Sequence, residues 1–207
     1  MPGPRAPEEQ RRKEILHAAF TVASRERLTG CKVSEVAKEA GVSKGLIFFY
    51  FDNKDTLLVS LLEWLLNRTI LARVDEEILQ LKSPRERFLA VLRKDIERLP
   101  GQRETVELFF DYWVMGTRHP DIQRMIRGAL DRYRDALRPL AEAVMEAEPA
   151  RYEDVTADGL AAVAAGFIEG CALQIVMDPG RFEVEAYLTS LHALVARHYR
   201  PDDDAKS

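Results

Sequence analysis

The stretch that decides the fold runs from residue 33 to residue 51 and reads VSEVAKEAGVSKGLIFFYF. It contains two short segments with a helical spacing of apolar residues, 33–40 and 44–50, separated by a turn that begins with Gly41 and ends with Ser43. A glycine can adopt the left-handed conformation that ends a helix, and a serine hydroxyl can accept a backbone N–H at the start of the next one. The sequence therefore predicts two short helices that meet at a sharp angle.

The rest of the chain has the same periodicity. Apolar residues recur at intervals of three and four, and the alternation typical of a β-strand is not sustained anywhere, so the predicted fold class is all-α. Ser83, followed by proline, is a typical helix start. We expect about nine helices: the short pair and segments at 8–27, from 54 past 66, and at 84–99, 103–115, 120–148, 155–177 and 183–199.

Charge divides the chain into two parts. The 207 residues are enough for one or two compact units, and the formal net charge of −4 argues against a uniformly basic nucleic-acid binder. Residues 1–55 nevertheless carry a small basic surplus, whereas the remainder is acidic. Such a surplus is also compatible with an ordinary solvated face. We place a domain boundary here, which gives an N-terminal domain at 1–55 and a second domain at 56–207.

Several classes of protein are disfavoured by what the sequence lacks. Cys31 and Cys171 lie too far apart in sequence to form a C-x-x-C metal or redox motif, and we expect no disulfide, metal or cofactor. The polar, charged N-terminus does not resemble a signal segment, and no uninterrupted run of eighteen apolar residues is present. We therefore expect a cytoplasmic protein that does not span a membrane.

The first alternative interpretation of the chain is an enzyme, but the sequence shows no recognisable catalytic motif. The sequence has no glycine-rich phosphate loop, no G-x-S-x-G elbow and no H-E-x-x-H motif. The four histidines lie on separate predicted helices without metal-ligand spacing: His17, His119, His192 and His198. We expect each of them to be a surface or core residue, and we expect no enzymatic activity.

The second short helix has the features of a DNA-reading helix. Such a helix is short and presents its N-terminal residues to base edges in the major groove. Lys44 can contact a phosphate or a guanine edge, Gly45 allows close approach of the backbone, and the Tyr50 hydroxyl can bind a phosphate. Lys54, at the start of the following helix, adds a further charge. We expect Phe48 and Phe51 to pack in the core, and leave core packing and DNA contact equally open for Phe49.

Residues 35–58, EVAKEAGVSKGLIFFYFDNKDTLL, together with ILHAA at 15–19, closely resemble the N-terminal signature of the TetR/AcrR family of transcription regulators. The resemblance covers residues 11–58. It implies a three-helix DNA-binding domain, a six-helix domain for ligand binding and dimerisation, and a repressor released by a small molecule. The candidates for DNA contact that it carries over by position are Ser43, Lys44, Gly45, Leu46, Phe49, Tyr50 and Lys54.

Three positions depart from the family pattern. Arg27 stands where the family usually has glycine, and we expect Gly30 to supply the turn instead. Lys32 replaces a threonine, which removes a capping hydroxyl but adds a possible phosphate contact. Phe48 replaces a common tyrosine. These departures keep open a second alternative, a helical small-molecule sensor or scaffold without operator binding.

Beyond residue 58 the resemblance is weaker and rests on features such as Phe110-x-x-Trp113 and the GFIEG run at 166–170. Helical bundles place ligand sites between helices, in mostly apolar surroundings with a few polar groups. The candidates for contact with a small, lipophilic effector are Phe109, Phe110, Trp113, Met125, Phe167, Cys171, Gln174 and Met177. Glu169 or His119 could orient a polar group, and core packing remains the alternative for each of these residues.

The penultimate predicted helix is rich in glycine and alanine, which let helices approach closely. Together with Tyr187, Leu188 and Leu191 on the last helix, it suits a four-helix interface between two copies of the chain. A two-fold dimer would present two reading helices to half-sites about 34 to 36 Å apart. We therefore expect a homodimer formed through the last two helices and a palindromic double-stranded operator, with monomeric packing of these helices as the alternative.

Overall fold

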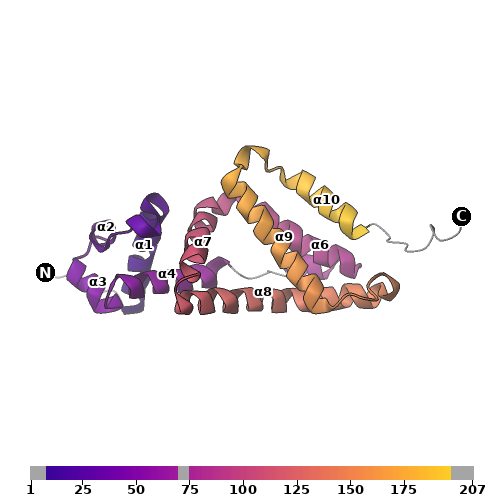
Figure 1. Ribbon diagram of the computed structural model, residues 1–207, viewed down its shortest axis with the longest axis horizontal. Helices are drawn as coiled ribbons and strands as arrows, with labels where there is room; N and C mark the ends of the chain where they lie inside the picture. The colour runs from indigo at the N-terminus through magenta and orange to yellow at the C-terminus, as the bar shows by residue number, and fades with distance from the viewer. Residues whose placement is uncertain (1–7, 70–74, 197–207) are drawn as a thin grey trace, which may run out of the picture. The chain divides into compact units, whose positions relative to one another are not determined.

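The computed structural model describes residues 8–69 and 75–196, and these residues form helices and the turns between them, without a strand. The prediction of an all-α fold is confirmed (Figure 1). The helices are α1 (Glu8–Gly30), α2 (Val33–Glu39), α3 (Lys44–Phe51), α4 (Lys54–Thr69), α5 (Glu76–Leu79), α6 (Pro84–Arg98), α7 (Arg103–Gly116), α8 (Pro120–Ala147), α9 (Ala157–Met177) and α10 (Val184–Ala196), with 3₁₀ turns at Pro100–Gln102, Pro149–Arg151 and Pro179–Arg181.

The helix pattern follows the sequence closely. The addition to the nine predicted helices is α5, a single turn of four residues. The predicted last helix extends to residue 199, and residues 197–199 lie outside the described part of the chain. His198 lies outside it as well.

The described residues form two compact units. The first contains those within 1–70 and 104–129, and the second those within 71–103 and 130–207. The division differs from the boundary expected at residue 55, because α4 and α7 pack with the N-terminal helices. Each unit contains one of the two cysteines, Cys31 in the first and Cys171 in the second, and both are buried free thiols.

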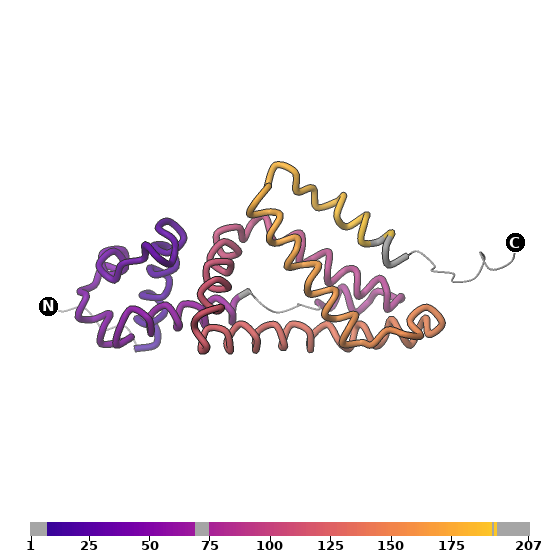
Figure 2. Tube along the Cα trace, viewed as in Figure 1, coloured from indigo at the N-terminus to yellow at the C-terminus, as the bar shows by residue number. Residues whose placement is uncertain are grey.

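The turn between α2 and α3 has the conformation that the sequence predicts. Gly41 has a φ of +63°, in the left-handed region, and the Ser43 hydroxyl accepts a hydrogen bond from the backbone N–H of Leu46 at 3.2 Å. The Asn53 carboxamide oxygen caps α4 in the same way, accepting from the backbone N–H of Thr56 at 2.9 Å. The Cα trace shows α2 and α3 as two short helices joined by this tight turn (Figure 2).

The core of the first unit lies between α1, α2, α3, α4 and α7. Alternating pairs of leucines along α4 point inward, as the sequence predicts, and α7 adds Leu108 and Tyr112, both fully buried. The Tyr112 hydroxyl donates a hydrogen bond to the carbonyl oxygen of Leu58 at 2.7 Å, which satisfies the buried polar group. The buried leucines of α4 are Leu57, Leu58, Leu61, Leu62, Leu65 and Leu66.

The second unit has its own core, in which α9 and α10 both pack against α6 (Figure 1). The Ser83 hydroxyl and Pro84 begin α6 as predicted. Asp95 of α6 is buried and accepts hydrogen bonds from the Tyr133 hydroxyl and the Arg98 guanidinium. Burial raises the pKa of the Asp95 carboxyl, and the bond from Tyr133 and the charge of Arg98 partly oppose the rise.

The turn near the end of α1 is made by Arg27 and not by Gly30. Arg27 has a φ of 63° and a ψ of 165°, which interrupts α1, whereas Gly30 does not have a positive φ. The expectation that Gly30 supplies the turn is therefore wrong. The physical reason is that the side chain of Arg27 is held by carboxylates of α7, which lie far away in sequence.

Candidate nucleic-acid interface and effector residues

The recognition-helix candidate, α3, is anchored by one side and exposed on the other. Ile47 and Phe51 are buried, as expected for Phe51. Phe49 is 74% exposed and Phe48 is 43% exposed. The expectation that Phe48 packs in the core is wrong. Ile47 and Phe51, which lie four residues apart on one side of α3, already fill the interior, and Phe48 lies outside that side. Two adjacent phenylalanines at the surface are a costly exposure of apolar area for an isolated chain.

The residues predicted to contact DNA lie around the start of α3 and on the neighbouring helix ends. Lys44 and Gly45 are exposed in the first turn, whereas Leu46 and Tyr50 are half-buried. A Cβ added at Gly45 would meet only the Ser43 hydroxyl oxygen, at 3.8 Å. The fold itself therefore does not require a glycine there, and the small residue leaves room for a partner molecule.

The flanking lysines mark the two helix starts beside α3. Lys32 is exposed and occupies the N-cap position of α2 without a side-chain capping bond, as its replacement of threonine predicts. Lys54 is half-buried and is the first residue of α4. Helix N-termini favour anions because their backbone N–H groups are unpaired. The two lysines add positive charge where such groups are available.

Arg12 of α1 fixes the end of α3. Its guanidinium donates to the carbonyl oxygen of Tyr50 at 2.9 Å and to the hydroxyl of Ser60 at 2.9 Å, and it lies 4.4 Å from the centre of the Phe51 ring. The three contacts join α1, α3 and α4. A cation at the C-terminal end of a helix is also favourable for the helix dipole. Arg12 therefore sets the position of α3 on its base, which no feature of the α2–α3 signature indicates.

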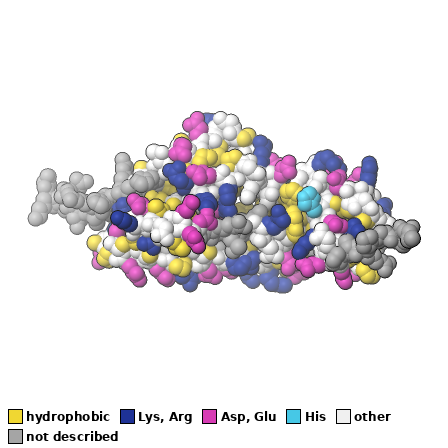
Figure 3. Space-filling view, turned by 180° about the vertical axis from the view of Figure 1, so that it is seen from behind, with side chains coloured by type: hydrophobic (Ala, Val, Ile, Leu, Met, Phe, Trp, Pro, Cys, Tyr) yellow, Lys and Arg dark blue, Asp and Glu magenta, His cyan; other side chains and the backbone are white. Residues whose placement is uncertain are grey.

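Charge on the surface is mixed. The space-filling view shows Lys and Arg side chains interspersed with Asp and Glu side chains over the face drawn, and hydrophobic side chains reach the surface between them (Figure 3). A broad field of one sign is not visible on this face. Any DNA contact on this face therefore depends on individual Lys and Arg side chains.

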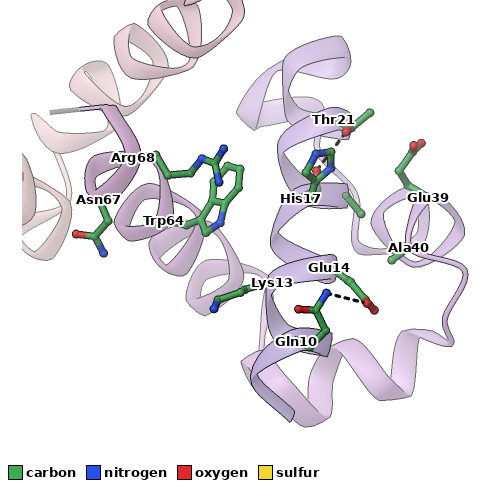
Figure 4. A pocket seen from close by; sticks show the side chains of 11 residues that line it. Gln10, Lys13, Glu14, His17, Thr21, Glu39, Ala40, Trp64, Asn67 and Arg68 are labelled. Carbon is green, nitrogen blue, oxygen red and sulfur yellow. Dashed lines mark hydrogen bonds between the residues drawn. The ribbon is translucent and has the colours of Figure 1, made fainter. Parts of the chain in front are cut away.

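An open groove of about 860 Å³ lies in the first unit between α1, the end of α2 and α4 (Figure 4). Arg68 lies over the ring of Trp64, with its guanidinium carbon 4.7 Å from the ring centre, and His17 meets the same ring edge-on at 6.4 Å. The lining is mixed, because charged side chains of both signs, Lys13, Arg68, Glu14 and Glu39, lie beside apolar surface that includes Trp64. The residues predicted to contact DNA or an effector do not line this groove.

Four of the predicted effector residues belong to the first unit. Phe109 and Met125 pack against its core. Phe110 and Trp113 are in edge-to-face contact on α7, with ring centres 5.8 Å apart, and Trp113 is 37% exposed. His119, the candidate for orienting a polar group, is exposed just before α8. Among these four effector candidates, the aromatic surface open to a ligand is therefore the Phe110–Trp113 pair.

The other four belong to α9 in the second unit. Cys171 is buried, and burial raises its pKa to about 11. Phe167 is half-buried, Gln174 accepts a hydrogen bond from the Tyr187 hydroxyl, and Met177 is 70% exposed. The eight candidates thus form two local groups, one in each unit.

Glu169 is the polar group of interest beside the α9 candidates. It is half-buried, and burial raises the pKa of its carboxyl, a rise that the positive charge of Arg134 partly opposes. A carboxyl in partly apolar surroundings gains from a hydrogen-bonding partner, because its desolvation is otherwise uncompensated. Glu169 is therefore suited to orient a polar part of a ligand, as the sequence suggests.

The surface of α9 carries a long apolar face. Val163 is 70% exposed and Leu173 is 43% exposed, and the small residues near them on the helix include exposed Ala162 and Gly166. Among the described residues, α9 is the one helix that is long and apolar enough to cross a membrane by length and composition, with a mean hydropathy of 1.9. Only 28% of that stretch is buried in the single chain. Such a face fits a helix that packs against a partner as well as one that enters lipid.

Comparison with known families covers both parts of the chain. Residues 15–61 match the family described as bacterial regulatory proteins, tetR family. Residues 84–200, more than half of the chain, match the C-terminal part of the BetI-type transcriptional repressors. The chain belongs to the tetR family. The resemblance carried by residues 11–58 is confirmed, and the BetI-type match extends it through the helices from α6 to α10.

Individual BetI regulators are similar in sequence to this tetR-family chain. The regulator BetI 1 from Chromohalobacter salexigens is 28% identical over 56% of the chain, which spans 58% of that relative's length. The regulator BetI from Rhizobium meliloti is 26% identical over 95% of the chain and 93% of its own length.

Solved structures share the fold of this tetR-family chain. A transcriptional regulator from Pseudomonas aeruginosa has a TM-score of 0.78 at 24% identity, covering 92% of this chain and 91% of that one. A regulator from Saccharomonospora viridis in complex with choline scores 0.71 at 20% identity, covering 91% and 96%. FadR from Bacillus subtilis in complex with stearoyl-CoA scores 0.71 at 22% identity, covering 91% and 99%.

Proposed function

We propose that this tetR-family chain is a ligand-responsive transcription repressor, which binds a palindromic operator as a homodimer and leaves it when a small molecule binds. The observation that carries the proposal is the surface of α3. Lys44 and Gly45 are exposed at its first turn, and Ile47 and Phe51 anchor its opposite side. This arrangement presents the N-terminal residues of a short helix to a major groove.

The contacts proposed are of two kinds. Lys32, Ser43, Tyr50 and Lys54 are placed to bind phosphates, which gives affinity and register. Lys44, Gly45, Leu46 and Phe49 lie on the part of α3 that would enter the groove, and a thymine methyl group suits the apolar side chains. The exposure of Phe48 adds it to this second group, although the sequence pattern assigns it to the core.

The exposed face of α9 supports the proposal of a homodimer. The chain alone leaves Val163, Leu173 and Met177 in contact with water. A second copy that covers this face, together with α10, would remove that apolar area and place two α3 helices on one side of the DNA. We propose the cytoplasm as the compartment, because the operator is the partner and the α9 face is assigned to the dimer.

The DNA part of the proposal is tested by selecting duplexes from a random pool with the purified full chain. We expect a palindromic motif whose affinity falls steeply with salt concentration, because phosphate contacts release counterions. Replacing Lys44 by alanine is expected to weaken binding of the selected duplex by about tenfold to one hundredfold. Fluorescence anisotropy at several salt concentrations measures both effects.

The matched control is Lys82→Ala, which removes an exposed lysine of the second unit and should leave the affinity unchanged. Equal affinities of the Lys44 variant and the natural chain would remove α3 as the reading helix. A failure to enrich any motif would favour the alternative, a helical sensor or scaffold that does not bind an operator.

The effector proposed is a small, lipophilic molecule with a polar end. Each unit offers a candidate surface by itself: the first has the aromatic Phe110–Trp113 pair, and the second has the partly desolvated carboxyl of Glu169. The solved relatives with choline and with stearoyl-CoA indicate two chemistries worth testing as probes, one a small cation and the other a long acyl chain. Binding that favours one arrangement of the dimer lowers operator affinity through the difference between the two states.

Tryptophan fluorescence can locate the effector, because the chain has two tryptophans, Trp64 and Trp113. We expect stearoyl-CoA or choline to shift the emission of a Trp64→Phe variant, in which Trp113 is the reporter. The Trp113→Phe variant keeps Trp64, which lines the groove between α1 and α4, and should show no shift. A probe that raises the melting temperature without changing the Trp113 emission would place the effector away from α7.

A further inference from the structure

Arg27 adopts a backbone conformation that an arginine avoids. Its φ of 63° and ψ of 165° fall in a region populated almost only by glycine, because a Cβ there meets the neighbouring carbonyl group. The resemblance of residues 11–58 to its family predicts glycine at this position. The chain therefore keeps a strained residue where an unstrained one is the usual choice, and such strain persists only when other contacts hold it.

The hydrogen bonds of the Arg27 side chain go to α7. One guanidinium nitrogen donates to the Glu107 carboxylate at 3.1 Å, and the other donates to the Asp111 carboxylate at 2.7 Å and to the Glu107 carbonyl oxygen at 3.3 Å. The second oxygen of Asp111 accepts from the backbone N–H of Leu28 at 3.3 Å. Arginine suits this arrangement, because its planar guanidinium presents several fixed donors at once.

The helix that receives these bonds is itself attached to the DNA-binding helices. Tyr112 of α7 is fully buried and bonded to the carbonyl oxygen of Leu58 in α4. A different side of α7 carries the Phe110–Trp113 pair. One helix thus bonds to the end of α1, is anchored on α4, and presents the aromatic pair that we assign to the effector.

We propose that Arg27 is a positioning residue that fixes the first turns of α2 and α3 relative to α7, and that this link sets the separation of the two reading helices in the dimer. The inference rests on the proposed operator binding. A purely structural turn would be made better by glycine, and half-exposed ion pairs contribute little stability. What Arg27 adds over glycine is a directional bond from α1 to α7, which can transmit a displacement of α7 to the helices that read DNA.

The test measures half-site spacing and not affinity alone. The duplex selected by the full chain is altered by inserting or removing one base pair between its half-sites, and binding is measured for the natural chain, Arg27→Gly and Asp111→Asn. We expect the natural chain to lose about tenfold in affinity on such a change. Each variant should lose only about threefold, because the reading helices are then free to adjust.

Arg25→Ala is the matched control. Arg25 lies two residues away and forms ion pairs with Glu26 and Glu39 within the DNA-binding helices. This variant should keep the spacing preference of the natural chain. Circular dichroism establishes that each variant is folded, and the double variant Arg27→Gly/Asp111→Asn should behave as Arg27→Gly alone, because both changes break the same link.

The outcomes separate the two proposals. If the natural chain has a preferred spacing and Arg27→Gly keeps it unchanged, the positioning role of Arg27 is wrong while operator binding stands. If all spacings weaken equally in Arg27→Gly, Arg27 supports the fold and not the positioning. If the natural chain binds no duplex, operator binding fails, and the positioning role fails with it.

Discussion

Replacement of Arg12 by alanine is expected to lower the free energy of unfolding by about 2 kcal/mol and to remove measurable operator binding. The guanidinium makes two hydrogen bonds that link Tyr50 of α3 to Ser60 of α4, and it covers the ring of Phe51. Without it, the end of α3 loses its attachment to α1, and the hydroxyl of the buried Ser60 loses the hydrogen bond from the guanidinium. Chemical denaturation and fluorescence anisotropy with the selected duplex measure the two effects.

The neighbouring arginine provides the control for this prediction. Arg11 forms a surface ion pair with Glu14 at 2.7 Å, and its replacement by alanine should change the stability by about 0.5 kcal/mol or less. Arg12→Lys keeps the charge but cannot reach both acceptors with a planar group, and should fall between the two. An Arg12→Ala variant as stable as Arg11→Ala would show that α3 is held by its apolar contacts alone.

Replacement of Val163 by arginine is expected to convert the proposed homodimer to a monomer and to weaken operator binding by about one hundredfold or more. Val163 is 70% exposed in the single chain, so the substitution should not disturb the fold of the second unit. In a close helix interface, however, a long charged side chain would be buried without a partner, which is strongly unfavourable. Sedimentation velocity measures the assembly state.

A valine of similar exposure on another helix makes a matched control. Val114 of α7 is 68% exposed, and Val114→Arg introduces the same side chain away from α9. This variant should remain dimeric. A Val163→Arg protein that stays dimeric would move the interface to a different surface, and the apolar face of α9 would then need another explanation, such as contact with lipid.

Local rules account for most of the helix pattern. Gly41, Ser43 and Ser83 act as the sequence predicts, because a positive φ or a capping hydroxyl depends only on a few neighbouring residues. The buried leucines of α4 also follow from spacing, since an inward stripe of a helix repeats every three or four residues. The departures concern features that depend on distant parts of the chain.

Arg27 and Phe48 illustrate that limit. A turn at Arg27 becomes possible only because Glu107 and Asp111 come from a segment 80 or more residues away, which no local pattern reveals. Phe48 is apolar and lies between the core positions Ile47 and Phe51, so its place in the sequence predicts a buried side chain. The interior is filled by Ile47 and Phe51, and Phe48 is exposed. The division into compact units also depends on distant parts of the chain, because α7 belongs to the first unit through tertiary packing and not through its place in the sequence.

The candidate DNA and effector residues follow from the sequence to different degrees. Lys44 and Gly45 are recognisable because a short capped helix has few orientations on its base. The effector candidates depend on which faces of α7 and α9 remain uncovered, and helical periodicity does not distinguish a covered apolar face from an open one. Arg12 carries no local signal at all, since its acceptors are 38 and 48 residues away.

The two buried thiols allow local opening to be measured separately in each compact unit. Cys31 is 1% exposed, and burial raises the pKa of its thiol, as it does for Cys171. The thiolate is the form that attacks an alkylating reagent, so each cysteine reacts only when its surroundings open to water. One thiol lies in each compact unit. The labelling rate of Cys31 therefore reports how often the DNA-binding helices open locally in the folded protein, and the rate of Cys171 reports the same for the helices around α9.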